Sequence, residues 1–290
     1  MTDFPISRGI MTIPERVGVY GGGRMGSGIA HAFLLAGTSV TLIEADATAA
    51  EAAAQRVTMS LSKAEARGGL REPVHLLQQR LTVSADAAVL KGCGLVVEAV
   101  PEIPELKAAV LGRIEAAAPE AVLATNTSSL SVNRLAATLS RPQSFVGLHF
   151  FNPVPASELV EIVVGAKTSE KLVTAAQSWV QALGKTAITV TDSPGFASSR
   201  LGVAISLEAM RMVEDGVASA ADIDTAMTLG YRHPMGPLRT TDIVGLDVRL
   251  AIAEHLAREV GPRFEPPAIL RDKVAAGELG RKTGQGFYAW

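Results

Sequence analysis

The sequence predicts an α/β fold, with a doubly wound sheet domain followed by a smaller all-helical domain. Three observations predict it. From residue 17 to residue 190, short β-branched runs alternate with longer Ala- and Leu-rich stretches, and a glycine cluster directly follows the first run. Beyond residue 194 only helical stretches remain. Strands that alternate with helices over such a length are typical of a parallel sheet covered by helices.

The elements of the sheet domain follow from these runs in order. Strands are expected at residues 17–20, 39–43, 81–83, 95–98, 122–125, 145–148, 159–164 and 185–190. Helices are expected between them at residues 25–35, 47–66, 103–117 and 170–183. The clearest is 47–66, because Ala, Glu, Gln and Lys are strong helix formers.

The second domain is expected to begin at a turn-forming cluster, Asp192-Ser193-Pro194-Gly195. This divides the chain into residues 1–191 and 192–290. Helices are then expected at residues 195–214, 220–229, 247–260 and 267–276. This helical segment is small for an independent soluble unit, and its apolar stretches need a surface to pack against. That surface is either the sheet domain or a second copy of the chain, so a homodimer is expected.

Composition excludes several classes of protein. Among 290 residues, 27 Lys and Arg oppose 29 Asp and Glu, which argues against a basic nucleic-acid-binding surface. The single cysteine, Cys93, excludes an intramolecular disulfide framework and a four-cysteine metal site, and fits a reducing cytoplasm. Apolar runs are strand-sized, and residues 1–16 contain no signal-peptide pattern. A cytoplasmic protein with no membrane, nucleic-acid or metal partner is expected.

The glycine cluster matches the dinucleotide-binding pattern G-x-G-x-x-G, with Arg24 and Met25 between its second and third glycines. Gly21 permits a tight turn, Gly23 lets the backbone approach a pyrophosphate, and Gly26 lets the helix pack closely on the strand. The pyrophosphate would lie at the positive end of the helix dipole. Because the cluster lies between a predicted strand and a predicted helix, it indicates a Rossmann-type domain.

Glu44 indicates which dinucleotide is bound. It lies 18 residues after Gly26, at the end of the second predicted strand. A carboxylate there accepts hydrogen bonds from a ribose diol and repels a 2′-phosphate, which favours NAD over NADP. Arg24 complicates this prediction, because its guanidinium could approach a phosphate. The alternative is a structural glycine turn with an unrelated surface glutamate.

Six further motifs occur in order along the chain: residues 126–130 (NTSSL), 147–154 (GLHFFNPV), 159–161 (LVE), 192–196 (DSPGF), 233–237 (HPMGP) and 281–288 (RKTGQGFY). Together with the glycine turn, they resemble the 3-hydroxyacyl-CoA dehydrogenases, including the short-chain 3-hydroxybutyryl-CoA enzymes. The resemblance runs from about residue 17 to the C-terminus. It implies an acyl-CoA substrate and NAD as cofactor.

Oxidation of a secondary alcohol needs a base for the hydroxyl proton, and histidine has the side-chain pKa nearest neutrality. A carboxylate on its other ring nitrogen holds the tautomer and stabilises the imidazolium. The resemblance implies that His149 and Glu161 form this pair, and that Ser128 hydrogen-bonds the substrate oxygen. The alternatives are a structural histidine beside an apolar strand, and a turn capped by Ser128 or Ser129.

The resemblance also implies cofactor contacts, from Asn152 on the nicotinamide side, from Glu102 and Lys107 near the nicotinamide ribose, and from Lys282. Surface Glu and Lys side chains are more often simply solvated, which is the alternative for the last three. By analogy alone, Lys63 would meet a phosphate of coenzyme A.

One position departs from the family pattern. Better-studied animal members carry an asparagine on the first helix of the second domain, where this chain has Ser199. Serine keeps a donor and an acceptor but is shorter, so the contact would need a shifted substrate, a water or a displaced helix. Retained activity with an altered contact is expected.

The expected activity is therefore NAD-dependent oxidation of L-3-hydroxyacyl-CoA, of short chain such as 3-hydroxybutyryl-CoA, to 3-oxoacyl-CoA. Two alternatives stay open. One is a dehydrogenase of a free hydroxy acid, of the sugar-acid or carnitine type, which would use the same catalytic pair. The other is a non-catalytic dinucleotide-binding protein, as in the lens crystallins that resemble this family, and only Ser199 points to it.

Overall fold

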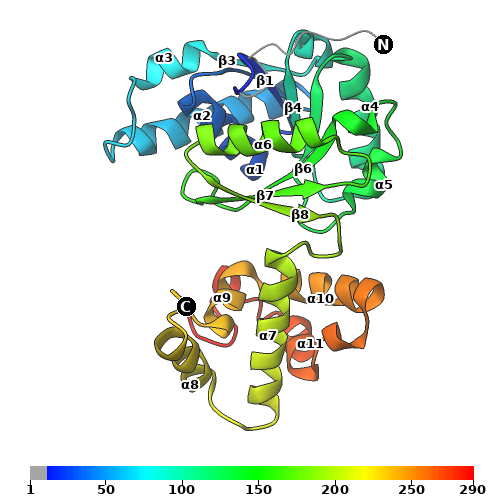
Figure 1. The fold of residues 1–290 in the computed structure, drawn as a ribbon. Helices are drawn as coiled ribbons and strands as arrows, with labels where there is room; N and C mark the ends of the chain where they lie inside the picture. The colour runs from blue at the N-terminus through cyan, green and yellow to red at the C-terminus, as the bar shows by residue number, and fades with distance from the viewer. Residues whose placement is uncertain (1–11) are drawn as a thin grey trace. The chain divides into compact units, whose positions relative to one another are not determined.

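The computed structural model describes residues 12–290 (Figure 1). The chain divides into two compact units, a sheet unit that ends at Asp192 and a helical unit, Ser193–Trp290. The division lies one residue beyond the start that the turn cluster predicts for the second domain. Each unit has its own buried apolar cluster. The α/β sheet followed by a helical unit confirms the predicted fold class.

The sheet unit is built on one eight-stranded sheet in the order β3-β2-β1-β4-β5-β6-β7-β8. Its first six positions have the doubly wound order in which dinucleotides bind where the strand order reverses, between β1 and β4. The strands are β1 (Arg16–Tyr20), β2 (Ser39–Ile43), β3 (Leu81–Ser84), β4 (Leu95–Glu98), β5 (Val122–Thr125), β6 (Phe145–Phe150), β7 (Leu159–Val164) and β8 (Thr186–Thr191).

One pair of strands departs from the predicted parallel sheet. β6 and β7 are antiparallel, whereas every other neighbouring pair is parallel. The link between them, residues 151–158, contains no helix. A parallel partner needs a crossover of a dozen or more residues, so this short link can only return the chain as a hairpin.

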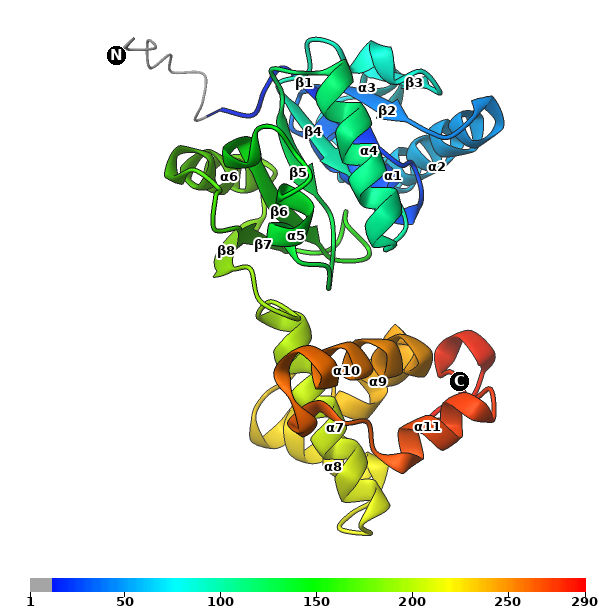
Figure 2. The same ribbon diagram turned by 90° about the vertical axis from the view of Figure 1, so that its right-hand side faces the viewer.

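Helices cover both faces of the sheet. One buried cluster joins α1, α2 and α6 to alternate residues of the strands, whereas α4 and α5 lie on the opposite face (Figure 2). A valine of α5, Val132, lies against the Cα of Gly147 in β6, where a Cβ would collide with it. The helices are α1 (Arg24–Leu35), α2 (Ala47–Glu65), α3 (Val74–Gln79), α4 (Pro104–Ala117), α5 (Val132–Ala136) and α6 (Glu170–Ala182).

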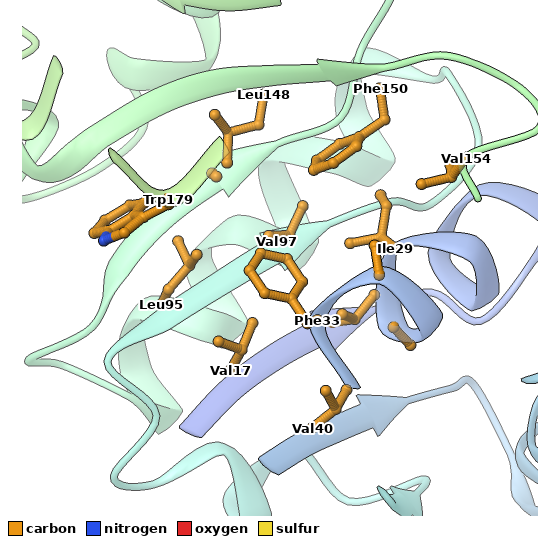
Figure 3. Packing of buried hydrophobic residues seen from close by; sticks show 14 of the residues in the cluster. Val17, Ile29, Phe33, Val40, Leu95, Val97, Leu148, Phe150, Val154 and Trp179 are labelled. Atoms are coloured by element: carbon orange, nitrogen blue, oxygen red, sulfur yellow. The ribbon is translucent and has the colours of Figure 1, made fainter. Parts of the chain in front are cut away.

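Figure 3 shows the cluster in which Phe33 and Ile29 of α1 pack on the sheet, close to Val97 of β4. Phe33 is fully buried. At the carboxyl end of β6, Phe150 and Val154 extend this cluster toward the start of α1. Val146, Leu148 and Phe150 of β6 belong to this cluster, so the alternation of a strand directs His149 to the other face.

The helical unit consists of α7 (Ser198–Glu214), α8 (Ala220–Thr225), α9 (Pro237–Val244), α10 (Leu246–Val260) and α11 (Ala268–Ala275). The predicted helix 195–214 begins three residues late, because Gly195 (φ 73°) and Phe196 (φ 48°) have left-handed backbones that no α-helix accepts. The predicted helix 220–229 ends as α at Thr225 and continues as a π turn. The short helices α3, α5 and α9 were not predicted.

Two buried aspartates hold the C-terminal motif of the helical unit in place. Asp242 accepts hydrogen bonds from the backbone N–H groups of Phe287 and Tyr288 and from Nε1 of Trp290, each at 2.9 Å. Asp224 caps the start of α9 and accepts from the Tyr288 hydroxyl at 2.7 Å. The 281–288 motif is therefore part of the packing of this unit.

None of the helices in residues 12–290 has both the length and the apolarity that a membrane span requires.

Candidate active site

A cavity of about 740 Å³ opens at the carboxyl edge of the sheet in the sheet unit. The first turn of α1 and the segments that follow β1, β2, β4, β5 and β6 line it. The sequence-predicted residues among its lining are Gly21, Gly23, Arg24, Met25, Glu44, Glu102, Ser128, His149 and Asn152. Folding thus brings together residues that lie more than a hundred positions apart.

The backbone of the glycine turn leaves no room for a side chain at two of its glycines, Gly21 and Gly26. Gly21 has a positive φ of 98°, and a Cβ there would lie 2.9 Å from the backbone of Ala99. A Cβ on Gly26 would lie 1.7 Å from the carbonyl oxygen of Gly21, so only glycine lets α1 start this close to β1. Gly23 is the N-cap of α1 and makes no side-chain hydrogen bond there, and a Cβ added to it would meet nothing within 4 Å.

This turn fits a dinucleotide pyrophosphate. The first N–H groups of a helix have no intrahelical acceptor, and neither a capping side chain nor an acidic residue occupies them here. Arg24 and Met25, which form the start of α1, line the cavity. An anion placed there meets unpaired donors and the positive end of the helix dipole.

Glu44 lies at the end of β2, on the wall of the same cavity. Its Oε1 accepts from the backbone N–H of Gly22 at 2.8 Å, and its Oε2 accepts from the N–H of Ala45 at 3.1 Å. Arg56 of α2 donates through Nε to the carbonyl oxygen of Gly22 at 2.9 Å, and its Nη2 lies 3.9 Å from Glu44. The glycine turn itself therefore holds the carboxylate in place, with Arg56 as a second support.

His149 and Glu161 lie directly opposite each other in the antiparallel ladder of β6 and β7. Opposite residues of such a pair have Cβ atoms about 4.5–5.5 Å apart on one face of the sheet. The His149 Nδ1 lies 2.6 Å from the Glu161 Oε2. The Glu161 side chain is fully buried, and the His149 side chain is 8% exposed and reaches the cavity.

This arrangement can orient a base. A buried carboxylate only accepts hydrogen bonds when ionised, so it selects the tautomer in which Nδ1 carries the proton. The Nε2 atom is then the basic nitrogen of the ring. Asn126 fixes the end of β6, because its Oδ1 accepts from the backbone N–H of Phe150 at 3.0 Å. The Phe151 ring packs at 4.4 Å from the imidazole, centroid to centroid.

Ser128 lies on the cavity wall in the loop that follows β5. The helix after this loop, α5, is capped by Ser131, whose Oγ accepts from the N–H of Arg134, and not by Ser128 or Ser129. Ser128 and Ser129 instead donate their backbone N–H groups to Glu102.

Lys107 is fully buried, contrary to the solvated alternative considered for it. Its ammonium donates to Glu98 Oε1 at 2.7 Å and to the carbonyl oxygens of Val100 and Asn126 at 3.2 and 3.1 Å. Glu98 is also fully buried and accepts from Thr125 Oγ1 and Val100 N–H. Burial raises the pKa of Glu98, although the Lys107 ammonium and these hydrogen bonds oppose the rise. Lys107 is not among the residues that line the cavity.

The link after β6 places Asn152 at the cavity. This link packs on α1 at Gly28, where a Cβ would lie 2.8 Å from Val154. Lys185, just before β8, donates through Nζ to the carbonyl oxygens of Val154 and Ser157. Burial lowers the pKa of Lys185, and Glu158 opposes this effect.

Six of the predicted site residues do not line this cavity. Gly26, Lys107 and Glu161 lie next to residues that do, and the other three are Ser199, Lys282 and Lys63. Ser199 is in the first turn of α7, and Lys282 pairs with both carboxylate oxygens of Asp247 at 2.6 Å; both belong to the helical unit. Lys63 lies exposed in the last turn of α2. Within residues 12–290, no cluster of His, Cys, Asp and Glu could hold a metal ion.

Sequence reasoning missed several supporting residues: Arg56, Glu98, Asn126 and Lys185. Only Glu98 and Asn126 carried a usable signal, because both lie at the carboxyl ends of predicted strands, where doubly wound sheets bind ligands. Arg56 and Lys185 act through backbone carbonyls that only the folded chain brings near them.

Both units of the chain match one protein family. Residues 16–193 match the family model described as 3-hydroxyacyl-CoA dehydrogenase, NAD binding domain, and residues 195–290 match the C-terminal domain of the same family.

Several known relatives are similar over nearly the whole chain. A 3-hydroxybutyryl-CoA dehydrogenase of Mycobacterium tuberculosis is 40% identical over 282 residues, which cover 95% of this chain and 98% of the relative. A probable 3-hydroxybutyryl-CoA dehydrogenase of Deinococcus radiodurans is 37% identical over 277 residues, covering 95% and 100%. The crystal structure of (S)-3-hydroxybutyryl-CoA dehydrogenase from Ralstonia eutropha superposes with a TM-score of 0.91 at 38% identity, covering 96% of this chain and 99% of that one.

Proposed function

Since this chain belongs to the 3-hydroxyacyl-CoA dehydrogenase family, we propose that it catalyses the NAD-dependent oxidation of short-chain L-3-hydroxyacyl-CoA to 3-oxoacyl-CoA. It is an oxidoreductase whose cofactor is NAD. The observation that carries the proposed chemistry is the His149–Glu161 pair at the edge of a cavity suited to a dinucleotide.

His149 is the proposed general base. Its Nε2 takes the proton of the substrate hydroxyl while Glu161, at Nδ1, keeps the ring oriented and stabilises the positive charge that forms on it. NAD, when bound, supplies the acceptor for the hydride, which leaves the substrate carbon that bears this hydroxyl. The Ser128 hydroxyl donates to the reacting oxygen as the alcohol becomes a ketone.

The proposed cofactor site follows the lining of the cavity. The backbone at Gly21, Gly23 and Gly26 holds the pyrophosphate, and Glu44 accepts from the ribose hydroxyls. Arg24 and Met25 present the first backbone N–H groups of α1. Asn152 and Glu102 line the cavity after β6 and β4, which supports their proposed contacts with the nicotinamide end of the cofactor.

Four of the proposed roles come from the family resemblance and not from the lining of the cavity. They are a cofactor contact by Lys107 and one by Lys282, a substrate contact by Ser199, and a coenzyme A contact by Lys63. For Lys107, the burial of its ammonium among protein acceptors favours a structural role, in which it stabilises the residues behind the cofactor site.

The test is reduction of acetoacetyl-CoA by NADH, followed by loss of absorbance of the reduced cofactor. Replacing His149 by Ala should lower kcat by about 100- to 10,000-fold while NADH still binds, because only proton transfer is removed. His75→Ala, at an exposed histidine of α3, is the matched control and should keep full activity. Wild-type turnover in His149→Ala would refute the assignment of the base.

The substrate class is tested in the same assay. Free acetoacetate and NADPH should each be poor substitutes for acetoacetyl-CoA and NADH. A preference for a free oxo acid would instead support the sugar-acid or carnitine type of dehydrogenase.

We also propose a homodimer located in the cytoplasm. Apolar side chains exposed on the helical unit, such as Leu201 of α7 and Val248 of α10, support a partner surface there. The single buried cysteine, Cys93, is consistent with a reducing compartment. Light scattering on the purified protein gives the oligomeric state directly.

A further inference from the structure

Glu102 joins two walls of the cavity. It follows β4, and its Oε1 accepts hydrogen bonds from the loop that follows β5. The donors are Thr127 Oγ1, the backbone N–H of Ser128 at 2.9 Å, and both N–H and Oγ of Ser129 at 3.2 Å. Because one oxygen receives all of them, the position of that oxygen determines where the main chain of Ser128 lies.

Glu102 is in turn held from behind. Its Oε2 lies 3.4 Å from the Lys107 ammonium, which also pairs with Glu98 at 2.7 Å. Both side chains of the Glu98–Lys107 pair are fully buried, whereas that of Glu102 is 34% exposed. Three charged side chains of alternating sign, Glu98, Lys107 and Glu102, therefore lie in sequence from the interior of the sheet to the cavity.

The carboxylate stays ionised at neutral pH. Burial raises the pKa of Glu102, but the Lys107 ammonium and the hydrogen bonds from the 127–129 loop lower it more, so that this pKa lies below its usual range. An ionised acceptor makes the stronger, charge-assisted hydrogen bonds with the loop.

We propose that Glu102, anchored by the Glu98–Lys107 pair, is a positioning residue for Ser128. This rests on the proposed function, in which the Ser128 hydroxyl donates to the reacting oxygen. Such a donor contributes most when it is already aimed at the place where charge develops and need not reorganise. Fixing the Ser128 main chain supplies that preorganisation, so the segment after β4 affects substrate chemistry as well as cofactor binding.

A double-mutant cycle tests this role. The variants are Ser128→Ala, Glu102→Ala and the combination, assayed with acetoacetyl-CoA at saturating NADH. Ser128→Ala should lower kcat by about 100-fold, as loss of an oxyanion donor does. Glu102→Ala should lower kcat by at least about tenfold, and the combination should be little worse than Ser128→Ala alone, because residues that act as a unit are not additive.

Two further variants make the result specific. Glu102→Gln keeps an acceptor oxygen for the Ser128 and Ser129 N–H groups, so it should recover much of the kcat lost in Glu102→Ala. If Glu102→Ala fails to fold, Glu102→Gln takes its place in the cycle, and its smaller loss of kcat should disappear when residue 128 is already alanine. Glu105→Ala removes an exposed carboxylate from the first turn of the same helix, α4, and should leave kcat and the Ser128→Ala penalty unchanged.

The outcomes separate this inference from the proposed function. If the penalties of Glu102→Ala and Ser128→Ala simply multiply, or if Glu102→Ala changes only the KM for NADH, Glu102 does not act through Ser128 and the inference is overturned. If Ser128→Ala alone has full kcat, the proposed role of Ser128 is wrong and the positioning role is lost with it.

Discussion

At the residue scale, the arrangement of His149 and Glu161 depends on strand register. The two residues are register partners across β6 and β7, so their side chains point to the same face and meet without any special loop. A shift of one residue in either strand would direct one side chain into the apolar cluster on the other face. The flanking apolar residues, Leu148 and Phe150 on β6 and Val160 and Ile162 on β7, oppose such a shift because they must stay buried in that cluster.

Replacing Glu161 by Gln should lower kcat by about 100-fold or more, because an amide neither holds the tautomer nor stabilises the imidazolium. NADH affinity should stay near that of the wild type, since Glu161 lies behind the histidine and not on the cavity wall. The measurements are steady-state kinetics and NADH fluorescence titration. Glu170→Gln, at an exposed position of α6, is the control, and an unchanged kcat in Glu161→Gln would remove this residue from the mechanism.

His31 gives the protein a predictable dependence of stability on pH. Burial, assisted by the nearby Lys185 charge, lowers the pKa of His31 from 6.5 to about 4. Between these values the unfolded chain binds the proton and the folded chain does not. The stability contributed by the neutral ring is therefore complete above pH 6.5 and is lost as the pH falls toward 4.

Between pH 7 and pH 4.5, the free energy of unfolding should fall by about 2 kcal/mol, because His31 binds a proton more readily in the unfolded chain than in the folded one. His31→Gln removes the titrating group while keeping a polar partner for Ser60 Oγ, which lies 2.9 Å from the imidazole Nδ1. Urea unfolding at both pH values should show the smaller loss in His31→Gln. Equal losses in the two proteins would mean that His31 titrates normally.

At the element scale, the start of α1 depends on Gly26. Gly26→Ala would place a Cβ 1.7 Å from the Gly21 carbonyl, which is backbone and cannot rotate away. The helix and the glycine turn must separate, so NADH affinity should fall by at least about tenfold, with a loss of stability of about 2 kcal/mol. Fluorescence titration and thermal unfolding measure both effects.

Gly112→Ala is the matched control, because Gly112 lies inside α4 and a Cβ added to it would meet nothing within 4 Å. Alanine there should stabilise the protein by about 0.5–1 kcal/mol and leave NADH binding unchanged. If Gly26→Ala bound NADH as tightly as Gly112→Ala does, close approach at Gly26 would not be needed.

The link between β6 and β7 is an element whose position depends on one side chain. Lys185→Met keeps the apolar stem but removes the donors to the carbonyl oxygens of Val154 and Ser157. Asn152 is then held less firmly, so we expect a several-fold higher KM for NADH. Lys171→Met, at an exposed position of α6, should have no effect, and the same kinetics in both variants would contradict an anchoring role.

At the scale of the whole molecule, the two units have separate cores and can be perturbed separately. In the helical unit, Asp242→Asn replaces one of the two acceptor oxygens of the side chain by an NH2 group, so one or two of the three buried donors lose their acceptor. The free energy of unfolding should fall by about 3 kcal/mol. Thermal unfolding should show a lower midpoint, and limited proteolysis should cleave first after residue 192 and leave the sheet unit intact.

Asp272→Asn, at an exposed position of α11, is the control and should change stability by less than about 0.5 kcal/mol. Simultaneous proteolysis of both units in Asp242→Asn would show that they unfold as one.

Local patterns were sufficient for much of the sheet unit. The strand–glycine turn–helix order at Gly21–Gly26, and the acidic residue at the end of the next strand, predicted the cofactor turn. The short helices α3 (Val74–Gln79), α5 (Val132–Ala136) and α9 (Pro237–Val244) were missed, because five to eight residues are too few for a clear helical period. The antiparallel direction of β7 was missed as well, since apolar runs do not reveal strand direction.

Covalent neighbours and the period of apolar residues specify strands, helices and turns, since these depend on contacts between residues close along the chain. The family was indicated by the resemblance of the ordered motifs, and NAD by that resemblance together with Glu44. Which side chains meet across the sheet depends instead on packing and register. Only the tertiary structure therefore revealed three features: the buried Lys107 beside Glu98, the 127–129 loop held by Glu102, and the Glu44 carboxylate supported by Arg56. Each of them joins segments that are separated in sequence.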